Sequence, residues 1–221
     1  NLLLYIATHD IKNDVYSVVM NSKIINSIKE LNEATRTKLI EEIQNSSCRV
    51  YDFIEKITLL LKMGRGKFTT NMSVTNLFGI IGQIISKYEN IVSDKKLKID
   101  FFGDKNISVF GDKDIIAEIF DNLISNAVKY SRYGGFIGIN ITTKKKYASV
   151  SIKDGGPGLD NYEKKKLFKE FYITKNNYDS GVKRVGLGLY ITKNLVRLLK
   201  GRISVNSEKG DGSVFIVYLP K

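Results

Sequence analysis

The chain has 221 residues, 43% of them apolar, and a net charge of +12, which is enough apolar material for a hydrophobic core in one or two domains. The single cysteine, Cys48, excludes an intramolecular disulfide, and no stretch has the pattern of a signal peptide or a membrane span. The charge suits an anionic ligand or partner, or a membrane surface, but the lysines are scattered without interleaved aromatic residues, which argues against nucleic acid binding.

Residues 1–64 predict two long helices, because they contain no proline and no glycine before Gly64. In the second helix, apolar residues recur at intervals of three, four or seven, with charged residues between them. These residues are Leu39, Ile43, Val50, Ile54, Ile57 and Leu61; the first helix carries Ile6, Val15, Val18, Ile25 and Ile28. Residues 31–35 are predicted to turn the chain. Two helices alone bury too little surface, so we expect a homodimer that forms a four-helix bundle.

The abrupt apolar start of the chain, residues 1–7, indicates a fragment of a longer protein. We expect the missing part to hold a sensor or an anchor. The present segment is expected in the cytoplasm, with any link to a membrane made only through that upstream part.

The first helix carries the chain's one histidine, His9, followed directly by Asp10 and, one turn later, by Asn13. A lone histidine is usually an ordinary core or surface residue. Here an unprotonated imidazole nitrogen can act as a nucleophile, and the adjacent carboxylate can hold the other ring nitrogen. Asn13 lies on the same helical face, where it can orient a water near the imidazole.

Beyond Gly64 the pattern changes to mixed helices and strands. Residues 64–67 predict a hinge, and Ser73 is predicted to cap a helix over residues 74–92. Strands are predicted over residues 97–102, 107–110, 136–143, 147–153, 202–207 and 213–219, and further helices from residue 111 and over 163–168 and 187–199. This order predicts an α/β sandwich, with helices on one face of a largely antiparallel sheet.

The stretch over residues 118–131 organises this second part. Its apolar residues are spaced as in a helix and predict a buried stripe of Ile119, Leu123, Ala127 and Val128. Asn122, Asn126 and Lys129 then share an adjacent face. An amide oxygen suits magnesium and a lysine suits a phosphate. The alternative is that one asparagine caps the helix and the lysine is solvated.

Two glycine-rich motifs follow. The segment Asp154–Gly158 comes directly after a predicted strand, and its glycines indicate positive φ angles or the close approach of a ligand, while its carboxylate can accept a hydrogen bond from an exocyclic amine such as that of adenine. Gly186-Leu187-Gly188 opens a predicted helix after a long polar loop, and such helix starts attract phosphate. Taken alone, the first motif is more often an ordinary turn, and the second is a weak signal for phosphate.

Taken in order, these motifs resemble the cytoplasmic core of sensor histidine kinases over nearly the whole chain. The matching motifs are His9-Asp10-x-x-Asn13, Asn122-x-x-x-Asn126-Ala127-x-Lys129-Tyr130, Asp154-x-Gly156-x-Gly158, Phe168-x-x-Phe171, Gly186-Leu187-Gly188-Leu189 and Gly210-x-Gly212-Ser213. The resemblance implies an α+β chain. Residues 1–64 would be the dimerisation and histidine phosphotransfer hairpin, and residues 65–221 a Bergerat-type ATP-binding catalytic domain.

The resemblance also implies roles for individual residues. Asn126 would hold Mg²⁺ with help from Asn122, and Lys129 would face the phosphates of ATP. The nucleotide would further contact Tyr130, Asp154, Gly156, Gly158, Gly186, Leu187, Gly188, Gly212 and Ser213. Phe168 and Phe171 would anchor a mobile lid by packing.

The implied reaction is phosphoryl transfer from ATP to His9, and then to an aspartate of a response regulator, which needs positioning and charge neutralisation more than covalent catalysis. Gyrase-like relatives carry a glutamate at the place of Asn122, so its absence favours transfer to a protein side chain over ATP hydrolysis. Asn13 implies a secondary activity as a phosphatase of the regulator.

Three positions depart from the family pattern. Asp14 stands where the family usually has a proline, Arg184 where the lid motif often begins with a glycine, and Tyr172-Ile173 where an arginine is common. Lys175, Lys183 and Arg184 are therefore candidates for the missing phosphate contact. Two alternatives stay open, an ATP-binding switch without phosphotransfer and a dimeric adaptor with a decayed pocket.

Overall fold

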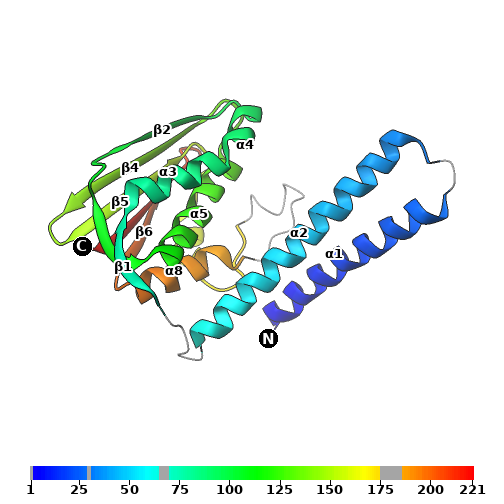
Figure 1. Ribbon diagram of the computed structural model, residues 1–221, viewed down its shortest axis with the longest axis horizontal. Helices are drawn as coiled ribbons and strands as arrows, with labels where there is room; N and C mark the ends of the chain where they lie inside the picture. Colours follow the sequence, from blue (N-terminus) through cyan, green and yellow to red (C-terminus); the bar gives the residue numbers. More distant parts are fainter. Residues whose placement is uncertain (1, 29–30, 65–69, 175–185) are drawn as a thin grey trace. The chain divides into compact units, whose positions relative to one another are not determined.

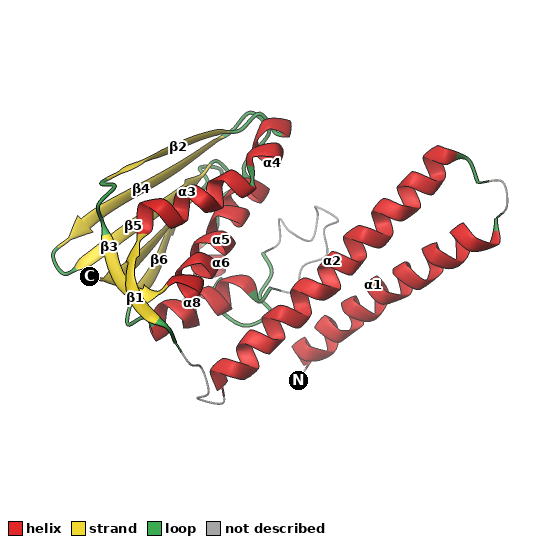
Figure 2. Ribbon diagram, in the orientation of Figure 1, coloured by secondary structure: helices red, strands yellow, loops and turns green. Residues whose placement is uncertain are grey.

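The computed structural model describes residues 2–28, 31–64, 70–174 and 186–221. These residues form two compact units, a helical hairpin and an α/β unit, which are described separately below. Figure 1 follows the chain through both units, and Figure 2 separates their helices from their strands. Within the described residues, no helix combines the length and the apolar character that a membrane crossing requires.

The hairpin consists of the two predicted helices, α1 (Leu2–Ser27) and α2 (Glu33–Gly64). The helix α2 begins earlier than predicted, because Asn32 caps it: its side-chain oxygen accepts a hydrogen bond from the backbone N–H of Thr35 at 2.8 Å. Residues 33–35 are therefore helical, and the prediction that the turn extends to residue 35 was wrong.

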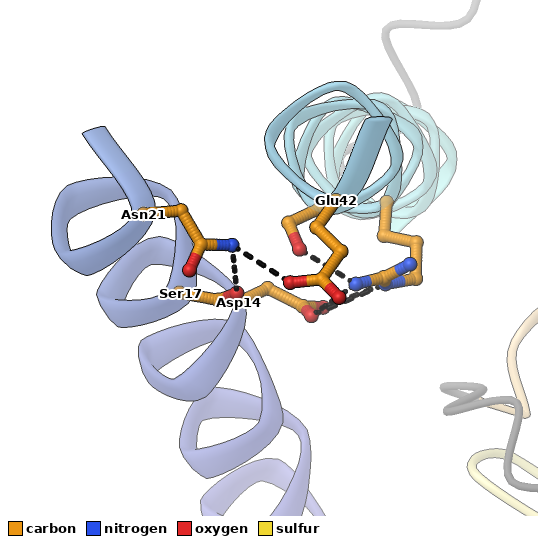
Figure 3. A network of polar contacts seen from close by, with 6 residues as sticks. Asp14, Ser17, Asn21 and Glu42 are labelled. Atoms are coloured by element: carbon orange, nitrogen blue, oxygen red, sulfur yellow. Dashed lines mark hydrogen bonds and ion pairs between the residues drawn. The ribbon is translucent and has the colours of Figure 1, made fainter. Parts of the chain in front are cut away.

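The interface between α1 and α2 is partly polar. Asp14 is only 7% exposed, and its carboxylate pairs with Arg49 of α2, with Nη2 at 2.8 Å from Oδ1 and Nε at 3.2 Å from Oδ2 (Figure 3). Arg49 also donates to the buried hydroxyl of Ser46 at 2.7 Å. One α1 heptad after Asp14, the buried amide of Asn21 donates to Glu42 at 3.0 Å. Two polar ties therefore fix the register of the two helices.

Many apolar side chains of the hairpin are exposed. They include members of both predicted stripes, Val15, Ile54 and Leu61, of which the last two are 54% and 55% exposed. Others are Tyr16, Val19, Ile40 and Tyr51. Contact between α1 and α2 alone therefore leaves much of the apolar surface of the hairpin in solvent.

The α/β unit is built on a five-stranded sheet in the order β2-β4-β5-β7-β6, in which β2 and β4 are parallel and all other neighbours are antiparallel. The strands are β2 (Lys98–Gly103), β4 (Phe136–Lys144), β5 (Tyr147–Asp154), β6 (Arg202–Ser207) and β7 (Ser213–Pro220). The predicted largely antiparallel sheet is confirmed.

Helices cover one face of this sheet (Figure 2). They are α3 (Leu77–Lys87), α4 (Glu89–Asp94), α5 (Lys113–Tyr130), α6 (Asn161–Lys166) and α8 (Gly188–Leu198). The core forms where the apolar stripes of the helices meet alternate residues of the strands, so that Ile119 of α5, Ile139 of β4 and Val217 of β7 are fully buried. The predicted sandwich with helices on one face is confirmed.

One predicted helix start was wrong. Ser73 does not cap a helix over residues 74–92, because Met72–Asn76 forms a strand, β1, that pairs antiparallel with β3 (Ser108–Asp112). The helix begins only at Leu77, where Asn76 accepts the backbone N–H of Gly79 at 2.7 Å. Pairing with a strand more than thirty residues away outweighs the local capping signal of Ser73.

Candidate functional site

The helix α5 carries the central part of the candidate site. Asp112 caps it by accepting the backbone N–H groups of Asp114 and Ile115. All four residues of the predicted stripe are buried, namely Ile119, Leu123, Ala127 and Val128. On the neighbouring face, Asn122, Asn126 and Tyr130 are half-buried and Lys129 is exposed. The amphipathic arrangement predicted for this helix is confirmed.

The two asparagines of α5 have different surroundings. The amide nitrogen of Asn122 donates to the hydroxyl of Thr192 at 2.7 Å, and Thr192 is fully buried in α8. A Cβ at Gly188 would lie 2.5 Å from Oδ1 of Asn122, so only glycine permits this approach between α5 and the start of α8. One turn later, the side chain of Asn126 makes no hydrogen bond to another described residue. Asn126 is therefore the asparagine available to a ligand.

Asp154, the last residue of β5, lies against the end of α5. Its side chain is 5% exposed and accepts the backbone N–H of Gly156 at 2.9 Å. Burial raises the pKa of Asp154, and hydrogen bonds from the N–H groups of Gly156 and Ser213 partly oppose this shift. A Cβ at Gly156 would lie 3.1 Å from the backbone oxygen of Tyr130. The structure thus brings Asp154 and Gly156 next to Tyr130.

Two glycines and two serines pack closely at the end of the sheet where β5 ends and β7 begins. Gly158 and Gly212 have positive φ angles of 68° and 80°, and a Cβ on either would lie within 2.0 Å of a backbone oxygen. Ser207 donates to the carbonyl of Gly212 at 2.6 Å and accepts the N–H of Leu159 at 2.8 Å. Ser213 is buried beside Ser207, with their hydroxyl oxygens 3.1 Å apart. The loops that follow β5 and β6 are therefore held together.

The described residues on either side of residues 175–185 meet. Gly186 has a φ of 70°, and its Cβ would lie 2.7 Å from the carbonyl carbon of Phe171. Phe171 itself has a φ of 57°, an uncommon angle for an aromatic residue. Phe168, also half-buried, packs under the ammonium group of Lys193 at 5.6 Å. Leu187 is buried, so its side chain belongs to the core. The candidates Lys175, Lys183 and Arg184 lie outside the described residues.

In the hairpin unit, His9 is exposed on α1, and the amide nitrogen of Asn13 lies 3.3 Å from its Nδ1. The predicted proximity of these two side chains is therefore present. The side chain of Asp10 lies outside the described part of the structure. Asp14, noted above as a departure from the family pattern, points into the hairpin interface rather than toward a ligand.

Three residues with a role in this architecture were missed by sequence reasoning. Thr192 interrupts the apolar stripe of α8, and Ser207 ends β6 as a buried hydroxyl; polar residues in apolar runs were the available signal for both. Lys95 gave no such signal. Its ammonium group donates to the backbone oxygens of Val128, Lys129 and Ser131 at 2.8, 3.0 and 2.9 Å and so caps the C-terminal end of α5. Its burial lowers its pKa.

The donor set of the site suits a weakly ligated magnesium ion. Among the described residues, no group of three or more His, Cys, Asp and Glu side chains is placed to hold a metal. The amide oxygen of Asn126 is an oxygen donor of the kind that magnesium accepts, and this ion usually completes its shell with phosphates and water.

The fold and the site together define an ATP-binding α/β sandwich of the Bergerat type, joined to a helical hairpin. A comparison with protein families supports this class: residues 111–221 match the family of histidine kinase-, DNA gyrase B- and HSP90-like ATPases. The match covers half of the chain. The chain belongs to this family.

Similar proteins narrow the class. The chain is 29% identical over 186 residues to the heme sensor protein HssS of Staphylococcus saprophyticus, covering 84% of this chain and 39% of that protein. It is 26% identical over 222 residues to the sensor histidine kinase RcsC of Escherichia coli strain K12, covering 100% of this chain and 23% of RcsC. The chain thus spans less than half the length of these curated relatives.

Solved structures share the fold. The histidine kinase AdeS of Acinetobacter baumannii superimposes with a TM-score of 0.75 at 20% identity, covering 96% of this chain and 97% of that one. The histidine kinase ThkA, solved in complex with the response regulator protein TrrA, gives a TM-score of 0.75 at 20% identity and covers 100% of this chain and 61% of that one. The predicted resemblance to the histidine kinase core is confirmed.

Proposed function

We propose that this chain is the core of an ATP-dependent protein-histidine kinase, which transfers a phosphoryl group from ATP to His9 and then to an aspartate of a response regulator. The observation that carries this proposal is the pairing of two sites on one chain. An ATPase-family domain presents the unpaired amide of Asn126 on α5 and a buried Asp154 beside the end of that helix, and the hairpin presents an exposed imidazole beside Asn13.

In the proposed nucleotide site, the adenine ring lies at the end of β5. The carboxylate of Asp154 accepts a hydrogen bond from the exocyclic amine of adenine. The ring is surrounded by Tyr130, Gly156, Gly158 and Ser213. The close packing of this end of the sheet supports the assignment. Gly156 and Gly158 have no Cβ atom, which lets neighbouring backbone segments approach closely. The discrimination of adenine from other bases would rest on Asp154.

The triphosphate would extend along the polar face of α5 toward the start of α8. Lys129 supplies a positive charge to the phosphates, and Gly186, Leu187 and Gly188 border them with backbone N–H groups. Lys175 is proposed as a further phosphate contact. Mg²⁺ would be held by Asn126, with Asn122 in support, and would neutralise phosphate charge when bound.

In the proposed transfer, one imidazole nitrogen of His9 attacks the terminal phosphoryl group, and ADP leaves. Asp10 would hold the other ring nitrogen and its proton, and so stabilise the charge that develops on the ring. Asn13 would position a water molecule for a second activity, the hydrolysis of the phosphoryl group on the regulator. Its contact with His9 at 3.3 Å supports this assignment.

The proposal also includes the partners and the division of the chain. Residues 1–64 would form the dimerisation and phosphotransfer domain, and residues 65–221 the catalytic domain. The exposed apolar residues of the hairpin support a homodimer. The response regulator as partner is inferred from the ThkA structure, which contains such a protein. A cytoplasmic location stays a prediction.

The decisive experiment incubates the chain with ATP carrying a labelled terminal phosphate, in the presence of Mg²⁺. We expect an acid-labile label on the wild-type protein, none on His9→Gln and none on Asn126→Ala. His9→Gln should still bind a fluorescent ATP analogue, whereas Asn126→Ala should bind it at least tenfold more weakly. Asn206→Ala, a change of an exposed asparagine on β6, serves as the matched control and should behave as wild type.

The outcomes separate the alternatives. Nucleotide binding without a labelled histidine would favour an ATP-binding switch that acts through a partner. The absence of nucleotide binding would favour a non-enzymatic dimeric adaptor. A label that survives in His9→Gln would place the acceptor on another residue and refute the proposed role of His9.

A further inference from the structure

The net positive charge of the chain lies almost entirely in the α/β unit. Residues 1–64 contain eight basic and eight acidic residues, whereas residues 70–221 contain 25 basic and 15 acidic residues, a net charge of +10. The nucleotide site needs only a few of these cations.

Six of them meet at one end of the sheet, which we call the lysine rim: Lys144, Lys145, Lys146, Lys200, Arg202 and Lys221. Strand register brings them together. Lys144 ends β4, and Lys145 and Lys146 form the turn to β5. Tyr147, next to this turn, pairs with Pro220, and Arg202 pairs with Tyr218. The backbone N–H of Lys221 donates to the carbonyl of Lys146 at 3.1 Å. The β4–β5 turn and the C-terminal residue lie at the same end of the sheet in Figure 1.

The rim contains exposed, unneutralised charge. All six side chains are exposed, and within the described part of the chain none of them forms an ion pair. The guanidinium of Arg202 lies over the ring of Tyr147 at 5.2 Å. The acidic residue that register brings to this end is Asp104, which follows β2, and its carboxylate accepts the backbone N–H of Asn106 at 2.9 Å.

Two rim lysines occupy backbone positions that glycine or asparagine would fill at lower cost. Lys145 has a φ of 56° and Lys200 a φ of 55°, and a side chain with a Cβ is disfavoured in this left-handed region. In the turns at Lys145 and Lys200, a lysine therefore occupies a backbone conformation that glycine or asparagine adopts more easily.

The open face of the sheet adds an apolar contact near the rim. Phe102 is 54% exposed on β2, and through its pairing with Asn140 it shares the uncovered face of β4 with Lys144. Four residues of strand rise separate them, about 13 Å. Exposed lysines combined with an exposed aromatic side chain are typical of protein surfaces that bind the interface of a lipid bilayer.

We propose that the lysine rim, with Phe102 beside it, docks the α/β unit onto a membrane surface that contains anionic phospholipid. Five of the six rim cations are lysines, which act as point charges and suit a diffuse layer of anionic headgroups; arginine is the preferred residue for bidentate contacts to nucleic acid phosphates. Asp154 lies seven strand residues from Tyr147, about 23 Å away, so docking leaves the nucleotide end of the sheet free.

The experiment measures the binding of the 221-residue chain to vesicles by flotation. At about 0.1 M salt, we expect at least about tenfold stronger partitioning onto phosphatidylcholine vesicles with about 30 mol % phosphatidylserine than onto phosphatidylcholine alone, and loss of this difference at about 0.5 M salt. The triple variant Lys144→Glu, Lys145→Glu, Lys146→Glu should lose at least about tenfold in partitioning. Phe102→Ser should lose a few-fold.

A matched triple variant changes the same charge elsewhere on the unit. Lys113→Glu, Lys165→Glu, Lys169→Glu replaces three exposed lysines outside the rim, and its partitioning should stay within about twofold of wild type. The thermal unfolding midpoints of both triples should match wild type, which separates lost docking from lost folding. The readout is independent of the proposed kinase activity.

Three results would overturn the proposal. The first is equal loss of vesicle binding in both triple variants, which would reflect net charge alone. The second is equal binding of the wild-type chain to neutral and anionic vesicles. The third is tight binding of a single-stranded RNA that depends on the rim lysines and displaces the vesicles, which would assign the rim to nucleic acid.

Discussion

The helical hairpin and the α/β unit differ in how completely each buries its apolar residues. In the α/β unit, Phe120, Ile116 and Ile81 are fully buried between the helices and the sheet. In the hairpin, Ile54 and Leu61 are more than half exposed, while Asp14 and Asn21 are buried in the contact between the helices. The α/β unit therefore has a complete core of its own, and the hairpin does not.

This difference matches the division of labour that we propose. A nucleotide site requires a rigid scaffold, because the amide of Asn126 and the carboxylate of Asp154 must keep their geometry. A phosphorylated histidine must reach different partners in turn, so it is better placed on an exposed helix.

Removal of a large side chain from the complete core should cost the most. Phe120→Ala is expected to lower the free energy of unfolding of the α/β unit by about 3–5 kcal/mol, because it removes a fully buried ring and leaves a cavity. Chemical denaturation of this unit measures the change. Phe110→Ala, a change of a 57% exposed ring on β3, is the matched control and should cost less than about 1 kcal/mol.

The polar interface of the hairpin should contribute less. Asp14→Ala leaves the guanidinium of Arg49 without its partner, and we expect a loss of about 1–3 kcal/mol in hairpin stability, since the arginine side chain is still 39% exposed. The double variant Asp14→Leu, Arg49→Met should recover most of this loss. If the double variant is no more stable than Asp14→Ala, the two side chains are not coupled through the ion pair.

The exposed apolar face of the hairpin should make its stability depend on concentration. If two copies complete the bundle, the association of the copies adds to the free energy of unfolding of the hairpin. A tenfold dilution lowers this contribution by about 1.4 kcal/mol for each dimer, so the unfolding midpoint of the hairpin falls. The midpoint of the α/β unit should not change. Ile54→Ser should remove the concentration dependence, whereas a hairpin midpoint that is constant on dilution of the wild-type chain would contradict the dimer.

The smallest effect is a pH dependence at Asp154. Its pKa is raised by burial, so the folded protein holds this proton more readily than the unfolded chain. The free energy of unfolding should therefore fall as the pH rises from about 3.9, the usual aspartate value, through the raised pKa. Over the same window, the affinity for an adenine nucleotide should increase, because the ionised carboxylate is the acceptor.

Calorimetric titrations across this pH range measure the affinity. Asp154→Asn should flatten the pH dependence and bind adenine nucleotides weakly at every pH, since the amide presents a donor as well as an acceptor. An unchanged pH profile in this variant would assign the titration to another group.

The sequence predicted most of the fold and much of the candidate site. The periodicity of apolar residues identified both hairpin helices, α5, α8 and the strands of the main sheet, because each pattern reflects one buried face of one element. The glycine-rich segment after β5 was predicted to need positive φ angles or the close approach of another group, and Gly158 has a φ of 68°. The order of these motifs along the chain was enough to suggest the family.

Contacts between residues far apart in the chain were beyond such reasoning. The pairing of β1 with β3, the ion pair of Asp14 with Arg49 and the cap that Lys95 places on α5 all join segments about thirty residues apart or more. The lysine rim likewise gathers residues of three separate segments, which the sequence showed only as scattered lysines. Local patterns record how an element divides between core and solvent; which side chains then meet is decided by the packing of the elements, and only the tertiary structure contains that information.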